Sequence, residues 1–168
     1  MRFLKSTAAV IALTAMAFAS IAQAEIIQIS ATALVLRSDS GTDSIGTAQN
    51  GVLQNARGKF YAPVVFPANG DDICRFSMVY RDFDAEADIT ARLLRKPLNV
   101  GGFAFNPPNE LASVASFGTN QNMRRATTTD IAGANIALAT NFYFVEVDLP
   151  ANTLQVVGLQ IDFRPICE

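Results

Sequence analysis

Apolar and polar residues alternate with a period of two along most of this chain after residue 24. In the segment 142–149, FYFVEVDL, the side chains of Tyr143, Val145 and Val147 fall on one face. The segment 154–163, LQVVGLQIDF, alternates in the same way. Successive side chains of a strand point to opposite faces of a sheet, so the pattern predicts strands with one buried face.

The same alternation predicts six further strands, at 26–37, 60–66, 73–81, 89–95, 111–117 and 124–129. Turn-forming residues such as Asn69-Gly70 and Pro107-Pro108 lie between them. No segment after residue 24 has the apolar period of a long amphipathic helix. About eight short strands at this spacing favour an all-β sandwich or barrel. We expect a single antiparallel β-sandwich, jelly-roll-like in type, over residues 25–168.

Two stretches of the chain have a similar sequence pattern. FYAPVVFPANGDDICRFSMVY and FYFVEVDLPANTLQVVGLQIDF each contain a strand, a Pro-Ala-Asn turn and a second strand. Proline presets the backbone for a turn and asparagine tolerates the left-handed region. Each stretch is therefore predicted to form a hairpin.

Residues 1–24 have the features of a cleaved signal peptide. Arg2 and Lys5 precede an apolar run at 8–19, and Ala-Gln-Ala at 22–24 supplies the small residues of a cleavage site. The apolar run is shorter than the ~20 residues of a membrane-spanning helix. A retained N-terminal anchor is the alternative. We expect a secreted or periplasmic protein that begins at Glu25 and has no transmembrane segment after cleavage.

The chain has two cysteines, Cys74 and Cys167. An exported protein meets an oxidising compartment, where an even number of cysteines favours a disulfide. Two free thiols with a catalytic role are the alternative, but the sequence has no histidine to activate one. A Cys74–Cys167 disulfide is therefore predicted.

The charge of the chain argues against a nucleic-acid partner. The leader holds two of the 13 basic residues and none of the 15 acidic ones, which leaves 11 against 15 and a net charge of −4. Nucleic-acid binding favours a basic face. The densest basic groups, Arg92 with Arg95 and Lys96, and Arg124-Arg125, are interpreted as solvated strand faces.

The residue types that are missing exclude several chemistries. Without histidine, one chain cannot form a Ser-His-Asp triad, a Cys-His dyad or a histidine zinc site. No Gly-x-Ser-x-Gly elbow or phosphate-binding glycine loop is present. Tryptophan, a common sugar-stacking residue, is also absent, although Tyr61, Tyr80 and Tyr143 remain. No catalytic residue and no cofactor are predicted.

The segment 79–90, VYRDFDAEADIT, contains four carboxylates, one at every second position from Asp82 to Asp88. Four like charges on one face of a strand would repel one another, so a loop is expected here. Calcium suits several loop carboxylates. An EF-hand pattern counted from Asp82 fails, because Ala87 and Leu93 occupy its glycine and glutamate positions. A solvated acidic loop is the alternative. The candidate calcium ligands are Asp82, Asp84, Glu86 and Asp88.

The order of these motifs resembles a broad, largely uncharacterised group of exported bacterial β-sandwich proteins. The resemblance lies in YAPV, MVYRDFD, ITARLLR, LASVASFGTN, NFYFVEVDL and LQIDF, over about residues 60–163. The group often has an Asp-Asn pair where this chain has RDFD. The resemblance implies an all-β fold and export, and it carries over no catalytic residue.

Two classes of function follow. The first is an exported, non-catalytic module that binds an unknown extracellular ligand or assembles with copies of itself. Its N-terminal strand, EIIQISATALVLR, is a candidate for pairing with a neighbouring molecule through exposed backbone groups, or else it closes its own sheet. The alternative class is a carboxylate-dependent hydrolase of extracellular polysaccharide, which needs two carboxylates flanking a cleft.

Overall fold

In this computed structural model, residues 25–37, 43–44, 46–49, 51–98 and 107–167 are described. Their strands are β1 Glu25–Ser30, β2 Val35–Arg37, β3 Thr47–Gln49, β4 Val52–Gln54, β5 Gly58–Val64, β6 Asp72–Asp82, β7 Thr90–Pro97, β8 Asn109–Ala115, β9 Asn120–Thr128, β10 Asn141–Leu149 and β11 Leu154–Arg164. Within these residues no helix is long and apolar enough to cross a membrane. The predicted signal peptide, residues 1–24, lies outside the described residues.

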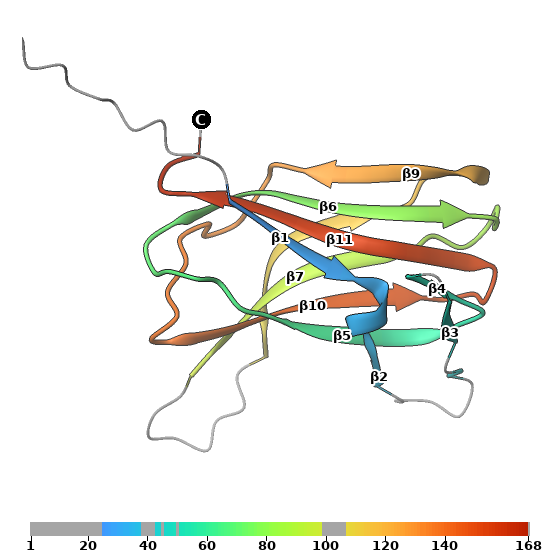
Figure 1. Cartoon of the computed structure of the whole chain (residues 1–168), viewed down its shortest axis with the longest axis horizontal. Coiled ribbons are helices and arrows are strands. Elements are labelled where there is room, and N and C mark those ends of the chain that lie inside the picture. The colour runs from blue at the N-terminus through green and yellow to red at the C-terminus, as the bar shows by residue number, and fades with distance from the viewer. Residues whose placement is uncertain (1–24, 38–42, 45, 50, 99–106, 168) are drawn as a thin grey trace, which may run out of the picture.

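The strands form two antiparallel sheets that pack into a sandwich (Figure 1). Sheet A has the order β3-β4-β11-β6-β9, and sheet B has the order β2-β5-β10-β7-β8. β1 is the sixth strand of sheet A. It pairs with the later part of β11, from Gly158 to Phe163, whereas β4 pairs with β11 at Val156. The predicted all-β antiparallel sandwich is confirmed, with eleven strands in the described residues in place of about eight.

The core lies between the two sheets and is built from the apolar positions of the alternating pattern. Phe66 is one of its buried aromatic residues, and its ring meets Tyr143 edge to face at 5.1 Å and Phe163 at 5.5 Å. Phe60 and Phe76 are buried in the same cluster. Edge-to-face contacts of this kind stabilise beyond the area that they bury.

The single strand predicted at 26–37 is two strands in different sheets. β1 belongs to sheet A and β2 to sheet B, and a 3₁₀ turn at Ala31–Ala33 joins them. The Ser30 hydroxyl accepts a hydrogen bond from the Thr32 N–H at 3.3 Å and so caps this turn. β1 pairs with β11 of its own chain, from Glu25 opposite Phe163 to Ser30 opposite Gly158. Pairing within the chain is thus the arrangement that the structure adopts.

The two predicted hairpins are wrong. The first Pro-Ala-Asn turn leads from β5 in sheet B to β6 in sheet A, and the second leads from β10 in sheet B to β11 in sheet A. Each turn therefore carries the chain across the sandwich. The partners of these strands come from elsewhere in the sequence: β5 pairs with β10, and β6 pairs with β11.

Candidate functional site

The acidic segment between β6 and β7 folds through its own carboxylates. Asp82 ends β6 and is fully buried. Its Oδ1 accepts a hydrogen bond from the Asp84 N–H at 2.9 Å, and its Oδ2 accepts one from the Ser116 hydroxyl at 2.6 Å. Groups of the protein therefore satisfy this buried carboxylate.

Asp84 holds the turn of this loop. Its Oδ1 accepts hydrogen bonds from the N–H groups of Glu86 and Ala87 at 2.9 and 3.1 Å, and its Oδ2 accepts one from the Thr153 hydroxyl at 2.9 Å. These donors, the Glu86 N–H foremost, lower the pKa of the Asp84 carboxyl. Both carboxylate oxygens are thus engaged within the protein.

The calcium hypothesis concerns Asp82, Asp84, Glu86 and Asp88. Glu86 is exposed, and Oδ1 of Asp88 lies 3.3 Å from the Ser116 hydroxyl. In the part of the chain that the structure describes, no group of three or more His, Cys, Asp or Glu side chains is placed to hold a metal ion. Calcium binding by this loop stays a prediction, and the hydrogen bonds of Asp82 and Asp84 give the loop a structural role.

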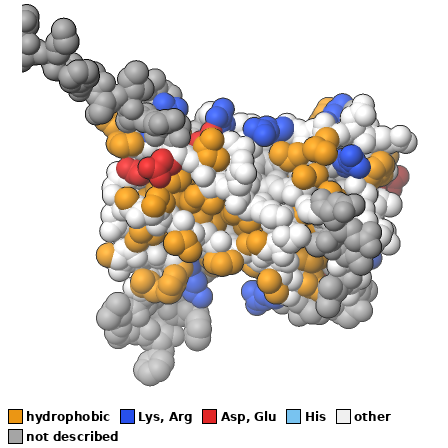
Figure 2. Space-filling model, viewed as in Figure 1, with side chains coloured by type: hydrophobic (Ala, Val, Ile, Leu, Met, Phe, Trp, Pro, Cys, Tyr) orange, Lys and Arg blue, Asp and Glu red, His pale blue; other side chains and the backbone are white. Residues whose placement is uncertain are grey.

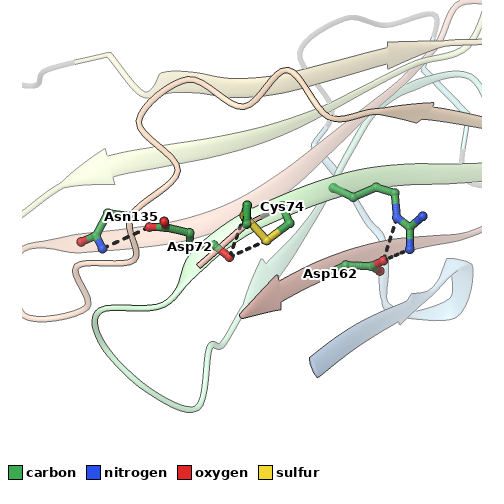
Figure 3. The surroundings of a disulfide bond; sticks show 6 residues. Asp72, Cys74, Asn135 and Asp162 are labelled. Atoms are coloured by element: carbon green, nitrogen blue, oxygen red, sulfur yellow. Dashed lines mark hydrogen bonds and ion pairs between the residues drawn. A yellow bond between two sulfur atoms is a disulfide. The ribbon is translucent and has the colours of Figure 1, made fainter. Parts of the chain in front are cut away.

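The predicted disulfide is confirmed. Cys74 in β6 and Cys167 after β11 are joined, although they are 93 positions apart in sequence (Figure 3). Both sulfur atoms lie near the Asp72 carbonyl oxygen, at 3.4 and 3.7 Å. These are contacts without a shared hydrogen, because a disulfide sulfur carries none. The bond fastens the segment after β11 to the neighbouring strand of sheet A.

The outer face of sheet A carries a groove where β11 is irregular. The ladder between β11 and β6 shifts by one residue between Val156 and Gly158, which marks a β-bulge. A Cβ atom on Gly158 would lie 2.9 Å from the Ile29 carbonyl oxygen, so glycine lets β1 approach closely here. The hollow over this point has a volume of about 380 Å³.

We call this hollow the β11 groove. Four neighbouring strands supply its walls, and their pairing places Gln28 of β1 opposite Gln160, and Val79 of β6 opposite both Gly158 and Arg125 of β9. The lining is mainly uncharged, and it combines hydrogen-bonding groups with small apolar ones: Gln28, Ser30, Val79, Arg125, Gly158 and Gln160. The pairing of these strands fixes the backbone beneath the groove, which positions a site more precisely than loops do.

A second hollow, of about 460 Å³, lies beside the disulfide on the same sheet. It is lined by Arg75, Asp162 and Arg164 as well as the two cysteines. Asp162 is almost fully buried and pairs with the Arg75 guanidinium, as Figure 3 shows. Its other oxygen accepts a hydrogen bond from the Gln160 amide at 2.8 Å. Because Gln160 also lines the β11 groove, the two hollows are neighbours along β11.

Arginine dominates this face of sheet A. Figure 2 shows basic side chains along the upper part of the view, where Figure 1 places β6, β9 and β11. Arg75 has its carboxylate partner in Asp162. Within the described residues, Arg81, Arg125 and Arg164 form no ion pair, and the Nε atoms of Arg81 and Arg164 are buried without a hydrogen-bond partner.

Sequence reasoning missed this group of arginines. Arg124-Arg125 was noted as a basic pair, but Arg75, Arg81 and Arg164 are isolated in sequence. They come together only because β6, β9 and β11 are neighbours in sheet A. The available signal was that Arg81 and Arg164 occupy the polar positions of alternating strands.

The outer face of sheet B has a different character. Tyr61 and Phe144 lie side by side, with ring centroids 6.0 Å apart. The Tyr61 hydroxyl donates to Glu146 at 2.6 Å, and Arg92 donates to the other oxygen of Glu146 at 2.9 Å. Burial, and then the hydrogen bond to Glu146 and its charge, raise the pKa of Tyr61 to about 12. Arg92 also contacts Glu110 at 3.3 Å, so its charge is shared between two carboxylates.

The three tyrosines have separate roles. Tyr80 and Tyr143 are buried in the core, where their hydroxyls accept hydrogen bonds from the N–H groups of Phe117 and Ala137. Tyr61 lies on the outer face of sheet B. None of them lines the β11 groove.

One hollow brings two carboxylates together, as the hydrolase hypothesis requires. It has a volume of about 260 Å³, lies between β8 and β9, and is lined by Glu110 and Asp130 among others. Both residues are exposed, and Glu110 is engaged with Arg92. A catalytic acid needs a raised pKa, which burial ordinarily provides. This hollow lacks that burial.

Comparisons with known proteins give little similarity. No protein-family model matches the sequence, and no curated protein matches it. Among solved structures, the chain is similar to the crystal structure of the CBM36-1 domain of a multidomain xylanase from the hindgut metagenome of Trinervitermes trinervoides. The identity is 12% and the TM-score 0.44, over 83% of this chain and 96% of that chain. The function of this chain is therefore inferred from its own residues.

Proposed function

We propose that this chain is an exported, non-catalytic module that binds an extracellular glycan in the β11 groove. The observation that carries the proposal is the groove itself, a hollow of about 380 Å³ built by four paired strands over the β11 bulge. Its amides and hydroxyl, from Gln28, Ser30 and Gln160, are suited to the many hydroxyl groups of a sugar.

Export and the lack of catalysis are supported by the chemistry of the chain. The Cys74–Cys167 disulfide is typical of proteins in oxidising compartments. The sequence contains no histidine for a nucleophile–base pair. The carboxylate in the hollow next to the groove, Asp162, is held in an ion pair with Arg75.

Binding is tested by filling the groove. The variant Val79→Trp places a large ring in the β11 groove, and the control Val35→Trp places the same ring on the exposed β2 at the other sheet. Binding of a panel of soluble polysaccharides is measured by affinity electrophoresis. We expect Val79→Trp to lose about tenfold or more in affinity and Val35→Trp to keep the affinity of the unmodified protein. Equal binding by both variants would contradict the proposal.

The same samples separate the two rival functions. Release of new reducing ends from any polysaccharide would favour the hydrolase hypothesis, and a Glu110→Gln variant would then be expected to abolish it. Light scattering after size exclusion tests self-assembly. A single-chain mass supports a binding module, whereas an open-ended assembly would favour the structural subunit.

A further inference from the structure

We propose that the ligand of the β11 groove is an extended acidic glycan, held by three arginines along sheet A. This inference rests on the proposed function and specifies its ligand class. We call Arg81, Arg125 and Arg164 the arginine strip. A glycan of this class carries carboxylate or sulfate groups on successive sugar units.

The first argument is charge. Among the described residues, the outer face of sheet A holds four arginines and fewer acidic side chains: Arg75 neutralises Asp162, and Asp72, opposite Arg164, accepts a hydrogen bond from the Asn135 amide and forms no ion pair with Arg164. The full sequence has a net charge of −2. A concentration of positive charge on one face of an acidic protein attracts anionic ligands to that face.

The second argument is the unsatisfied donors. In the described part of the chain, the Nε atoms of Arg81 and Arg164 are buried and have no hydrogen-bond partner. A buried donor without an acceptor is costly, and native proteins rarely keep one without a reason. Guanidinium groups bind carboxylate and sulfate-like anions through two parallel hydrogen bonds. Because these Nε atoms are shielded from solvent, a bound anion would supply the missing acceptors once the guanidinium groups turn outward to meet it.

The third argument is spacing. Arg81 lies opposite Gln155 near the start of β11, Arg125 lies beside the groove near Gly158, and Arg164 ends the strand. At about 3.3 Å per strand residue, the strip runs for about 30 Å. Its charges are thus distributed along a line, which suits a linear polymer better than a compact anion.

The chemistry between the arginines favours a glycan over a nucleic acid. Gln28, Ser30 and Gln160 lie in the middle of the strip, and their amide and hydroxyl groups are suited to the hydroxyl groups of a sugar. Among the described residues that line the β11 groove and the disulfide hollow, none is aromatic. Proteins that bind single-stranded nucleic acids ordinarily stack bases on aromatic side chains.

The test compares one polymer in two charge states. Isothermal titration calorimetry measures binding of a soluble polyuronate and of the same polymer after its carboxyl groups have been reduced to alcohols. We expect the polyuronate to bind about tenfold tighter or better, with an affinity that falls as salt rises. A single-stranded DNA of equal charge is the control for charge alone.

Variants assign the effect to the strip. Arg125→Gln and Arg164→Gln are each expected to weaken polyuronate binding by about tenfold, because each removes a charged hydrogen bond. Lys96→Gln, an exposed cation on sheet B, removes the same charge elsewhere and is expected to have little effect. Thermal unfolding of each variant confirms that the fold is kept.

The outcomes separate this inference from the proposed function. If the reduced polymer binds as tightly as the polyuronate and Val79→Trp blocks both, the groove binds glycans and the arginine strip does not select acidic ones. If DNA binds as tightly as the polyuronate, charge alone governs binding and the acidic-glycan inference is wrong. If no polysaccharide binds, both the proposed glycan-binding function and the acidic-glycan inference are wrong.

Discussion

Three buried carboxylates show how single residues are stabilised in this sandwich. Asp82 is held by Ser116 and a backbone N–H, Glu146 by Tyr61 and Arg92, and Asp162 by Arg75 and Gln160 (Figure 3 shows the Asp162–Arg75 pair). A charge removed from water is tolerated only when hydrogen bonds replace those of the solvent. Each of these carboxylates has its own donors.

The hydrogen bond between Tyr61 and Glu146 has a measurable effect on the pKa of Tyr61. Its pKa of about 12 lies above the ordinary 10.0, so the fold favours the protonated hydroxyl. The stability that this group contributes is complete below pH 10 and is lost as the pH rises from there towards about 12. We expect tyrosinate absorbance of the folded protein to show a titration with a pKa of about 12.

The control for this titration is Tyr61→Phe, which removes the hydroxyl and keeps the ring beside Phe144. The transition with a pKa of about 12 should disappear from the variant, and its stability should depend less on pH between 10 and about 12. Identical titrations of the two proteins would show that Tyr61 is not the group concerned.

Residue pairs of this kind were beyond sequence reasoning. The two cysteines could be paired because there was only one possible partner for each. Arg75 and Asp162 are 87 residues apart and become partners through the pairing of β6 with β11. A sequence fixes which residues are polar, but the contacts of a polar residue depend on strand order and register.

At the level of elements, the period of two located all eight expected strand regions. It could not assign strands to sheets, because the inner faces of both sheets are apolar in the same way. The Pro-Ala-Asn turns showed this limit, since turn residues determine a local reversal but leave the next strand free to join either sheet. The break at Ser30 within 26–37 was hidden for a similar reason. Ala31, Ala33 and Val35 continue the apolar alternation in sequence, although Ala33 and Val35 are exposed and Leu34 is buried instead.

The pairing of β1 with β11 depends on a glycine. In Gly158→Ala, the new Cβ would lie 2.9 Å from the Ile29 carbonyl oxygen, an atom of the backbone that cannot turn aside. We expect the free energy of unfolding to fall by about 1–3 kcal/mol, the usual cost of an overpacked site. Urea denaturation followed by circular dichroism measures it.

Val157→Ala is the matched control, because Val157 precedes Gly158 on β11 and also lines the groove. It shortens a half-buried side chain without adding a clash, and a loss below about 1 kcal/mol is expected. A Gly158→Ala variant as stable as the unmodified protein would mean that β1 moves aside without cost.

At the scale of the whole molecule, the disulfide closes a loop that contains most of the sandwich. Cys74 and Cys167 are 93 residues apart, and the chain-entropy estimate for such a loop is about 4–5 kcal/mol of stability. The double variant Cys74→Ser/Cys167→Ser should therefore unfold at a markedly lower urea concentration.

A reducing agent provides the internal check on this prediction. It should lower the midpoint of the unmodified protein to near that of the double variant and leave the double variant unchanged. If the reductant has no effect on a protein shown to be reduced, the bond contributes little to stability.

The disulfide also determines how the molecule would respond to a mechanical load. Glu25 pairs with Phe163, so the start of β1 and the end of β11 lie at the same end of the sandwich (Figure 1). A force that pulls Glu25 away from Cys167 would peel β1 from β11 one residue pair at a time, the geometry in which hydrogen bonds break in succession. At the other attachment point, the disulfide passes the load to β6 and spares β11. β1 would thus detach first, taking Gln28 and Ser30 out of the β11 groove while the remainder of the sandwich stays intact.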